Sequence, residues 1–317
     1  MTPTPHEGFA DRLAALVAER RSQLVLGLDP DPADLWPAAV EAAEAAGTGA
    51  AGPFGRVHRA VADHCRRLID AAGPHCVAVK PQLACFERIR GLDTVLPDVV
   101  AAARRRGLLV LLDAKRGDVP VTATAYAAAL AGVTRTPFGE VPGLGADAFT
   151  ANPLLGQDAL APLLDSGAGV FVLVRTSNPG AADVQDLELA AGGALWEALA
   201  RLTARSGAER VGACGLSDVG AVVGATAPEH LVRARALMPR TIFLLPGVGA
   251  QGGRVEELAP AWAPGRAAGL VTASRSIARA GPGGAGGVAE ELKRTAWEAA
   301  EGAEGATTIA PAWPSGT

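Results

Sequence analysis

The sequence predicts an α/β protein in which eight parallel strands close into a (β/α)8 TIM barrel within a single domain. Eight short apolar runs recur along the 317 residues, helical patterns separate most of them, and most runs end in polar residues. Apolar runs without strict alternation are typical of strands that are buried on both faces of a parallel sheet. Eight such units in a chain of this length favour a barrel.

The predicted strands are the apolar runs themselves. They lie at residues 24–28, 76–79, 108–112, 146–150, 170–174, 219–225, 242–245 and 269–273. Helical patterns between them lie at residues 54–72, 96–106, 122–131, 186–205, 228–237 and 254–259. A doubly wound parallel sheet is the alternative fold, because it uses the same succession of strands and helices.

The barrel domain is expected to span residues 1–301. The stretch after the first strand is long, and residues 30–75 hold two helical patterns with a Gly/Ala-rich joint at 47–55. We interpret residues 30–75 as a helical insertion on the barrel rim. Residues 288–301 are expected to form a closing helix, and residues 302–317 to form a disordered tail.

Composition excludes several classes of protein. A net charge of −4 gives no electrostatic footprint for nucleic acid. No apolar stretch of about 18 residues is present, and residues 1–20 lack the apolar core of a signal peptide, so we expect no membrane association. The four cysteines form no CxxC pair, and the five histidines show no HxxxH spacing. These patterns predict a cytoplasmic protein with reduced thiols and no metal site.

Lysine is rare in this chain. Only Lys80, Lys115 and Lys293 are lysines among the 29 Lys and Arg residues. Arginine holds its proton too tightly to deliver it to a substrate, so a retained lysine points to chemistry that arginine cannot perform.

Two of these lysines stand near the ends of predicted strands, together with acidic residues. Asp113 and Lys115 alternate along an extended segment and so share a face, and Lys80 ends the neighbouring run. Buried charges at a barrel mouth must alternate in sign, so we expect an ion-paired cluster there. Asp118 lies three residues beyond Lys115 and must curl back or reach a neighbouring subunit. The structural alternative is a salt-bridged loop that caps a helix.

A glycine-rich loop follows the seventh run. Its sequence, Pro-Gly-Val-Gly-Ala-Gln-Gly-Gly at 246–253, formally matches GxGxxG, and Arg275 could meet the 2′-phosphate of a dinucleotide. That fingerprint normally opens a sheet, however, whereas loops after the seventh and eighth strands of a barrel commonly bind phosphate. Backbone N–H groups of the loop, with Ser274 and Arg275, would form that site. A glycine-rich turn without a ligand is the structural alternative.

A third polar segment, 175–180, follows the fifth run. It reads Arg-Thr-Ser-Asn-Pro-Gly and places small hydrogen-bonding groups at the barrel mouth. Because such a sequence is also an ordinary turn, it is equally compatible with a turn and with a ligand contact.

Together these motifs resemble those of the orotidine 5′-phosphate decarboxylase family, in its longer bacterial subgroup. The shared features are Lys at the end of the second strand, Asp-x-Lys-x-x-Asp after the third and Ser-x-Pro-Gly after the fifth. Pro-Gly-Val-Gly-Ala-Gln-Gly after the seventh strand and Ser-Arg-Ser-Ile after the eighth complete the resemblance, which runs in chain order over residues 27–277.

The resemblance implies a catalytic set made of Lys115, Asp113, Lys80 and Asp118. In that family Lys115 would protonate C6 of the pyrimidine as carbon dioxide departs, while Asp113 lies against the substrate carboxylate. Lys80 would join the charge network and, with Asp29, hold the ribose hydroxyls. Asp118 would come from the partner subunit of a homodimer with shared active sites.

The resemblance also implies a substrate-binding set for orotidine 5′-monophosphate and its product UMP, made of Asp29, Thr122, Ser177, Gln251, Gly252 and Arg275. Thr122 would lie near the ribose and Ser177 would contact the pyrimidine edge. Gln251, Arg275 and the backbone around Gly252 would bind the phosphate. No cofactor is implied.

Three rival functions share parts of this pattern. A related sugar-phosphate lyase would use Mg²⁺, bound partly by an acidic residue at the end of the second strand, where this chain has Lys80. An NADP-binding oxidoreductase would use the glycine-rich loop for its cofactor. A non-catalytic nucleotide-binding barrel would not need the Asp113–Lys115 pair.

Overall fold

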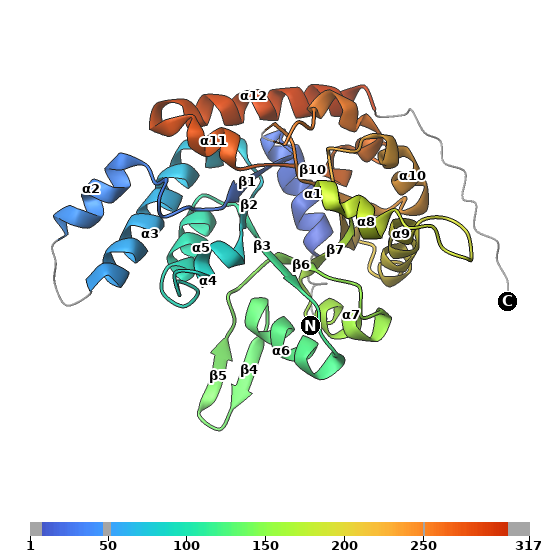
Figure 1. The fold of residues 1–317 in the computed structure, drawn as a ribbon, viewed down its shortest axis with the longest axis horizontal. Coiled ribbons are helices and arrows are strands. Elements are labelled where there is room, and N and C mark those ends of the chain that lie inside the picture. Colours follow the sequence, from blue (N-terminus) through green and yellow to red (C-terminus); the bar gives the residue numbers. More distant parts are fainter. Residues whose placement is uncertain (1–7, 47–51, 250, 304–317) are drawn as a thin grey trace, which may run out of the picture.

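Eight parallel strands of the chain close into a barrel (Figure 1). The computed structural model describes residues 8–46, 52–249 and 251–303. Around the barrel, neighbouring strands pair in the order β1-β10-β9-β8-β7-β6-β3-β2, and the ring closes from β2 back to β1. The predicted barrel is therefore confirmed, and the alternative of an open, doubly wound sheet is wrong.

Each barrel strand corresponds to one predicted apolar run. The strands are β1 (Leu24–Leu28), β2 (Ala78–Pro81), β3 (Leu109–Arg116), β6 (Ala148–Ala151), β7 (Gly169–Arg175), β8 (Ser217–Val223), β9 (Thr241–Leu245) and β10 (Gly269–Ala273). Strands β2 and β3 continue past their predicted ends, since β2 includes Lys80 and β3 runs through Asp113 to Arg116. The charged residues therefore belong to the strands themselves and inherit their alternation of faces.

Helices surround the barrel. They are α1 (Phe9–Arg20), α2 (Pro37–Ala45), α3 (Gly52–Ala72), α4 (Leu83–Glu87), α5 (Leu96–Arg105), α6 (Pro120–Leu130), α7 (Gln157–Leu164), α8 (Ala182–Gln185), α9 (Leu195–Ser206), α10 (Glu229–Leu237), α11 (Arg275–Arg279) and α12 (Gly281–Glu301). Short 3-10 helices are η1 (Gly73–His75), η2 (Pro179–Ala181), η3 (Val255–Trp262) and η4 (Arg266–Ala268). No helix among these described residues is both long and apolar enough to cross a bilayer.

The helix predicted over 186–205 is wrong in its first half. Only α9 forms there, because Gly192 and Gly193 adopt φ angles of 86° and 79°, which a continuous α-helix does not allow. The segment predicted as a helix at 254–259 is the 3-10 helix η3, which contains Pro260. Pro lacks the N–H that a helix interior needs. The closing helix α12 begins at Gly281, seven residues before its predicted start.

A hairpin that the sequence analysis missed projects from the end of α6. Its strands are β4 (Val133–Thr136) and β5 (Gly139–Pro142), and they pair antiparallel (Figure 1). Nearly all of their residues are exposed, so they lack the apolar runs by which the barrel strands were identified.

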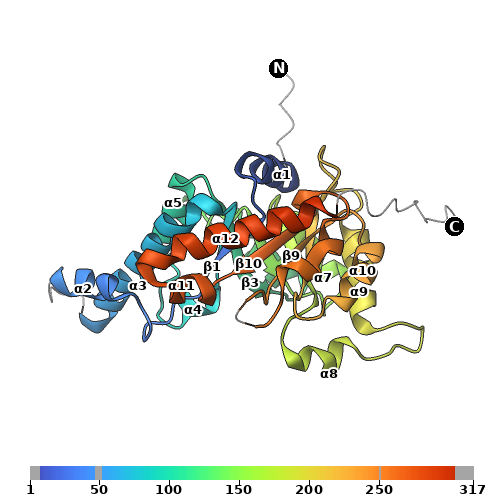
Figure 2. The same ribbon diagram turned by 90° about the horizontal axis from the view of Figure 1, so that it is seen from above.

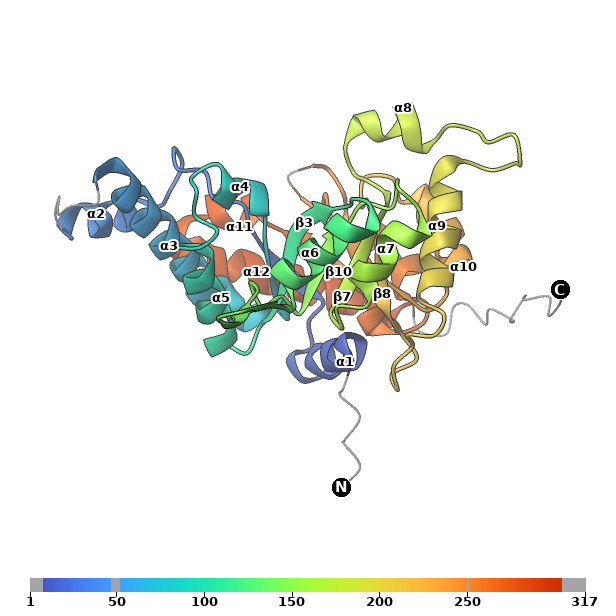
Figure 3. The same ribbon diagram turned by 90° about the horizontal axis from the view of Figure 1, so that it is seen from below.

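The strands divide the core into two layers. Leu24, Leu26 and Leu28 face the surrounding helices, whereas Val25 belongs to the cluster that fills the barrel interior. Helix α1 covers one end of the barrel, and α8 lies at the opposite end (Figures 2 and 3). At the α1 end, the ring of Phe9 meets that of Phe171 edge to face, with 5.8 Å between ring centroids. One end is thus sealed by apolar packing, and the polar strand ends lie at the other.

The long segment 30–75 contains two helices with different surroundings. Helix α3 packs against α5 and α12 and buries Val61, Leu68 and Ile69, so it serves as the covering helix that follows β1. Helix α2 packs against α3 and lies further from the barrel (Figure 1). The tail predicted at 302–317 lies outside the described residues, except for Gly302 and Ala303.

Candidate active site

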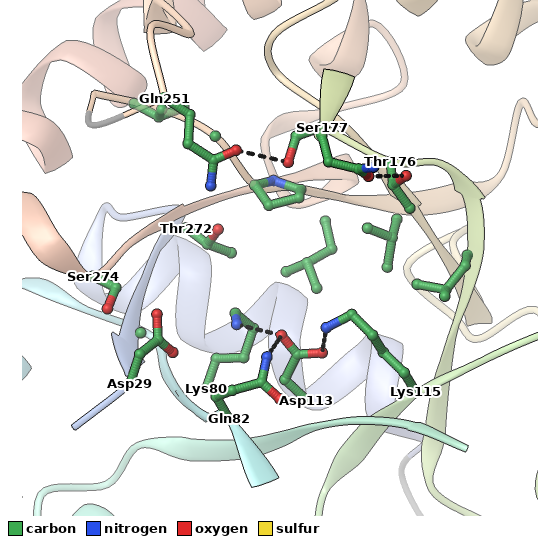
Figure 4. A pocket seen from close by; sticks show the side chains of 18 of the residues that line it. Asp29, Lys80, Gln82, Asp113, Lys115, Thr176, Ser177, Gln251, Thr272 and Ser274 are labelled. Carbon is green, nitrogen blue, oxygen red and sulfur yellow. Dashed lines mark hydrogen bonds and ion pairs between the residues drawn. The ribbon is translucent and has the colours of Figure 1, made fainter. Parts of the chain in front are cut away.

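A cavity of about 630 Å³ opens at the carboxyl ends of the barrel strands (Figure 4). Seven of the ten residues in the predicted catalytic and substrate-binding sets line it, namely Asp29, Lys80, Asp113, Lys115, Ser177, Gln251 and Arg275. They come from β2 and β3 or follow β1, β7, β9 and β10, so residues far apart in the sequence meet because parallel strands end at one rim.

The Asp113 carboxylate is the centre of the charged cluster (Figure 4). Its Oδ2 accepts hydrogen bonds from Lys80 Nζ at 2.7 Å and from Gln82 Nε2 at 3.1 Å. Its Oδ1 accepts from Lys115 Nζ at 2.5 Å and from Thr150 Oγ1 at 3.0 Å. A carboxylate has about four lone-pair sites. Four donors therefore fix both its position and its rotation.

Charge pairing keeps this cluster ionised. Burial raises the pKa of Asp113, but the two ammoniums outweigh that effect and lower the pKa to about 2. Burial lowers the pKa of Lys80, yet the carboxylates of Asp113 and Asp29 raise it more, so the pKa lies above its ordinary value. The structure therefore holds a carboxylate between two ammoniums at neutral pH.

The two lysines differ in exposure. The Lys80 side chain is 10% exposed, whereas that of Lys115 is 47% exposed. The Lys115 side chain is therefore accessible to a molecule in the cavity, whereas Lys80 is largely buried and bound to Asp113. The alternative of a helix-capping loop is not supported, because the first residues of α6 receive no side-chain cap and the Asp113 carboxylate is used by the cluster.

The backbone at Lys115 has an unusual conformation. Its φ angle is 49°, in the left-handed region, and the pairing of β3 with β6 shifts register between Leu112 and Arg116. A residue with a Cβ atom adopts this region at a cost of about 1–2 kcal/mol. Irregularities of this kind often re-aim a side chain beside an active site. Here the lysine reaches Asp113 from the same strand.

The structure does not bring Asp118, Thr122 or Gly252 to the cavity wall of this chain. Asp118 is half-buried and accepts a hydrogen bond from the backbone N–H of Val119 at 2.8 Å. Gly252 is exposed, with φ 91° and no atom within 4 Å of where a Cβ would stand. The loop that contains Gly252 does reach the cavity, through Pro246 to Val248 and Gln251.

The glycine-rich loop follows β9, the seventh barrel strand in chain order, and its glycines are needed for its shape. Gly247 and Gly249 have φ angles of 104° and 73°, and the N–H of Gly253 returns to the carbonyl of Gly247 at 3.0 Å. Arg275 follows β10 and is the first residue of the short helix α11. The loop and Arg275 thus follow the seventh and eighth barrel strands, where barrels commonly bind phosphate, and do not form the first turn of a dinucleotide-binding sheet.

Ser177 and Gln251 connect two loops across the cavity from Lys80 and Lys115 (Figure 4). Ser177 Oγ donates to Gln251 Oε1 at 2.9 Å. The neighbouring Arg175 is a structural residue and not a ligand contact, since it is buried and binds Asp186 through two hydrogen bonds of 2.7 and 2.9 Å. The segment 175–180 is therefore a turn in which Thr176, Ser177, Asn178 and Gly180 also line the cavity.

Sequence reasoning missed several polar residues of the site, among them Gln82, Thr150 and Thr272. Gln82 follows Lys80 by two residues, so strand alternation could have placed it on the same face. Thr150 lies in the predicted fourth strand, but its contact with Asp113 depends on how two strands are registered. Thr272 also lines the cavity. Among the described residues, no group of three or more His, Cys, Asp or Glu side chains is arranged to hold a metal ion.

A model of the orotidine 5′-phosphate decarboxylase / HUMPS family matches residues 22–292. The chain is 40% identical over 287 residues to the orotidine 5′-phosphate decarboxylase of Deinococcus radiodurans, and the match covers 87% of this chain and 90% of the relative. It is 42% identical over 274 residues to the enzyme of the same name from Haloarcula marismortui, covering 86% and 87% of the two chains.

Solved structures give the same result for the fold. A Leishmania donovani OMP decarboxylase superposes with a TM-score of 0.67 at 31% identity, covering 91% of this chain and 99% of that one. A structure from Toxoplasma gondii gives a TM-score of 0.75 at 31% identity, with 94% and 97% covered. The similarity therefore includes nearly the whole chain in each case.

Replacing Asp113 by Asn should destabilise the protein in a pH-dependent way. At neutral pH the change leaves two ammoniums without their carboxylate, and we expect a loss of several kcal/mol in the free energy of unfolding. Because the folded pKa of about 2 lies below the ordinary 3.8, the contribution of ionised Asp113 is complete above about pH 5 and is lost as the pH falls through 4 towards 2.

Denaturant unfolding of both proteins between pH 7 and 2.5 measures this difference. The gap between wild type and Asp113→Asn should be constant down to about pH 5 and then narrow. Asp70→Asn is the control, because Asp70 forms an exposed ion pair with Arg106 and should contribute less than about 1 kcal/mol. A gap that did not change with pH would contradict the assigned charge state.

Proposed function

The chain belongs to the orotidine 5′-phosphate decarboxylase family, in its longer subgroup, and catalyses decarboxylation of orotidine 5′-phosphate to UMP in pyrimidine biosynthesis; we propose that Lys115 and Asp113 perform this reaction without a cofactor. The observation that carries the proposal is the buried Asp113 carboxylate with an ammonium on each side, at the wall of a cavity.

Lys115 is the proposed proton donor. Loss of carbon dioxide leaves the electron pair of the broken bond on C6 of the pyrimidine, where the ring cannot readily delocalise it. An ammonium fixed beside C6 stabilises this charge and then transfers one proton to C6, which leaves a neutral amine and UMP. Charge that is already in place before the reaction is usually the largest catalytic contribution. The exposure of Lys115 towards the cavity supports this role.

Asp113 and Lys80 are proposed to hold the reacting groups in place. The Asp113 carboxylate would lie against the carboxylate of the substrate, and its negative charge would favour departure of neutral carbon dioxide. Lys80, with Asp29, would bind the ribose hydroxyls. Lys80 is hydrogen-bonded to Asp113. The lysine that would bind the ribose therefore also holds the Asp113 carboxylate in place.

The opposite side of the cavity is proposed to bind the rest of the nucleotide. Arg275, Gln251 and the backbone near Gly252 would hold the phosphate, and Ser177 would contact the pyrimidine edge. The phosphate lies away from C6, so its binding energy can hold the loops closed over the site. The Ser177–Gln251 hydrogen bond supports such coupling between the two loops.

We further propose a cytoplasmic homodimer in which Asp118 enters the partner's site and Thr122 lies near the shared ribose. Helix α6, which follows Asp118, exposes Val121, Ala125 and Ala129 at intervals of four residues. Residues at this spacing share one face of a helix, and Val121 is 84% exposed. An apolar exposed face directly beside Asp118 is what a second copy of the chain would cover.

The reaction itself is tested by measuring UMP and carbon dioxide formed from orotidine 5′-phosphate in the presence of EDTA. Full activity is expected. Strict dependence on Mg²⁺ would favour the related sugar-phosphate lyases, and a melting temperature raised by NADP but not by UMP would favour an oxidoreductase.

Lys115→Arg should retain the fold and lose nearly all turnover. The guanidinium keeps the positive charge but does not release its proton to C6. The measurements are kcat and the melting temperature, with Lys293→Arg in α12 as the matched control that should keep full activity. Wild-type turnover by Lys115→Arg would contradict the proton-donor role.

A mixture of Lys115→Arg and Asp118→Asn proteins should regain activity if two chains share each site. Each variant alone should be nearly inactive, whereas a mixed dimer holds one site in which Lys115 and Asp118 are both intact. Activity is measured after subunit exchange has been verified with differently tagged chains. Exchange without recovery would refute the shared site.

A further inference from the structure

A buried threonine connects the two residues that the proposed reaction depends on most. Thr150 lies in β6, which pairs with β3, and only 1% of it is exposed. Its neighbours Phe149 and Ala151 face the helices, while Ala148 belongs to the interior cluster, so Thr150 points inwards. It is not among the residues that line the cavity.

One hydroxyl makes both connections. Thr150 Oγ1 accepts a hydrogen bond from the backbone N–H of Lys115 at 2.8 Å and donates one to Asp113 Oδ1 at 3.0 Å. The directions are fixed by chemistry, because an N–H only donates and an ionised carboxylate only accepts. The hydroxyl thus joins the backbone of one residue to the side chain of the other.

The hydrogen bond from the Lys115 N–H to Thr150 lies where regular pairing between β3 and β6 is interrupted. The pairing of β3 with β6 shifts register between Leu112 and Arg116, and Lys115 has a φ angle of 49°. Thr150 supplies an acceptor for the Lys115 N–H inside this irregular stretch. Without the hydroxyl, this N–H would lose that partner, and the segment would be free to return to a regular strand. In a regular strand Lys115 would still share a face with Asp113, but its backbone would lose the positive φ angle that aims the ammonium at its present position beside Asp113 Oδ1.

We propose that Thr150 is a positioning residue that holds the Lys115 backbone and the Asp113 carboxylate in their reactive arrangement. The proposal rests on the roles given above to Lys115 and Asp113. Thr150 acts through these two residues and not on the substrate, so its loss should lower kcat while KM changes little.

Four variants test this role. Thr150→Val keeps the volume but removes the hydroxyl, and kcat should fall by roughly ten- to a hundredfold, as expected when a reacting group is misplaced by about an ångström. Thr150→Ser and Thr150→Ala form a second pair that differs only in the hydroxyl, and Ser alone should keep kcat near the wild-type value. Thr203→Val is the matched control, because Thr203 is as buried as Thr150 and its hydroxyl donates to Leu199 O within α9.

The variants are compared by kcat and KM for orotidine 5′-phosphate and by melting temperature. Thr203→Val should lose stability but not kcat. If Thr150→Val fails to fold, the Ser and Ala variants decide the matter. If the wild type is active, equal kcat values for Thr150→Ser and Thr150→Ala would overturn the positioning role. So would an effect of Thr150→Val on KM alone. A wild type that is inactive towards orotidine 5′-phosphate would instead overturn the proposed reaction.

Discussion

The Asp113 carboxylate between two lysines is the interaction on which the rest of the site depends. Two ammoniums this close to each other repel, and each would be costly to bury alone. The carboxylate makes both tolerable, because its oxygens accept from Lys80 at 2.7 Å and from Lys115 at 2.5 Å. Gln82 and Thr150 fill its remaining positions, so it has no freedom to rotate away. A rigid carboxylate in turn fixes where the Lys115 ammonium stands.

The barrel separates this polar cluster from the part of the protein that provides stability. At the end covered by α1, Phe9 packs on Phe171, and a Cβ at Gly169 would lie only 2.4 Å from the Phe9 ring. That end is thus closed by tight apolar packing. The other end holds charges, glycine loops and a residue with strained backbone, all of which cost stability. Parallel strands make this division possible, since every strand begins at one end and finishes at the other.

The sequence predicted the parts of the fold that depend on local patterns. Every barrel strand is an apolar run, and the placement of Lys80 and Asp113 follows from strand ends and alternation. The β4–β5 hairpin was missed because exposed strands have no apolar run, and the helix at 186–205 was shortened by Gly192 and Gly193. Contacts that depend on the register between strands could not be predicted from local sequence patterns. Thr150 is the example, because it stands beside Asp113 only through the register that pairs Leu111 with Ala148 and Leu112 with Phe149.

Charge balance explains why such a cluster suits the proposed reaction. Before substrate binds, the cluster around Asp113 carries two positive charges and one negative. The substrate carboxylate would add a second negative charge beside Asp113, and that charge would move to C6 when the carbon–carbon bond breaks. The ammonium of Lys115 would face the negative charge both before and after this step, so the protein would not need to rearrange its own charges. A site that requires no such reorganisation is the arrangement by which fixed charges lower a barrier most effectively. The strained backbone of Lys115 is then a reasonable cost, because it keeps the ammonium at the place where the charge arrives.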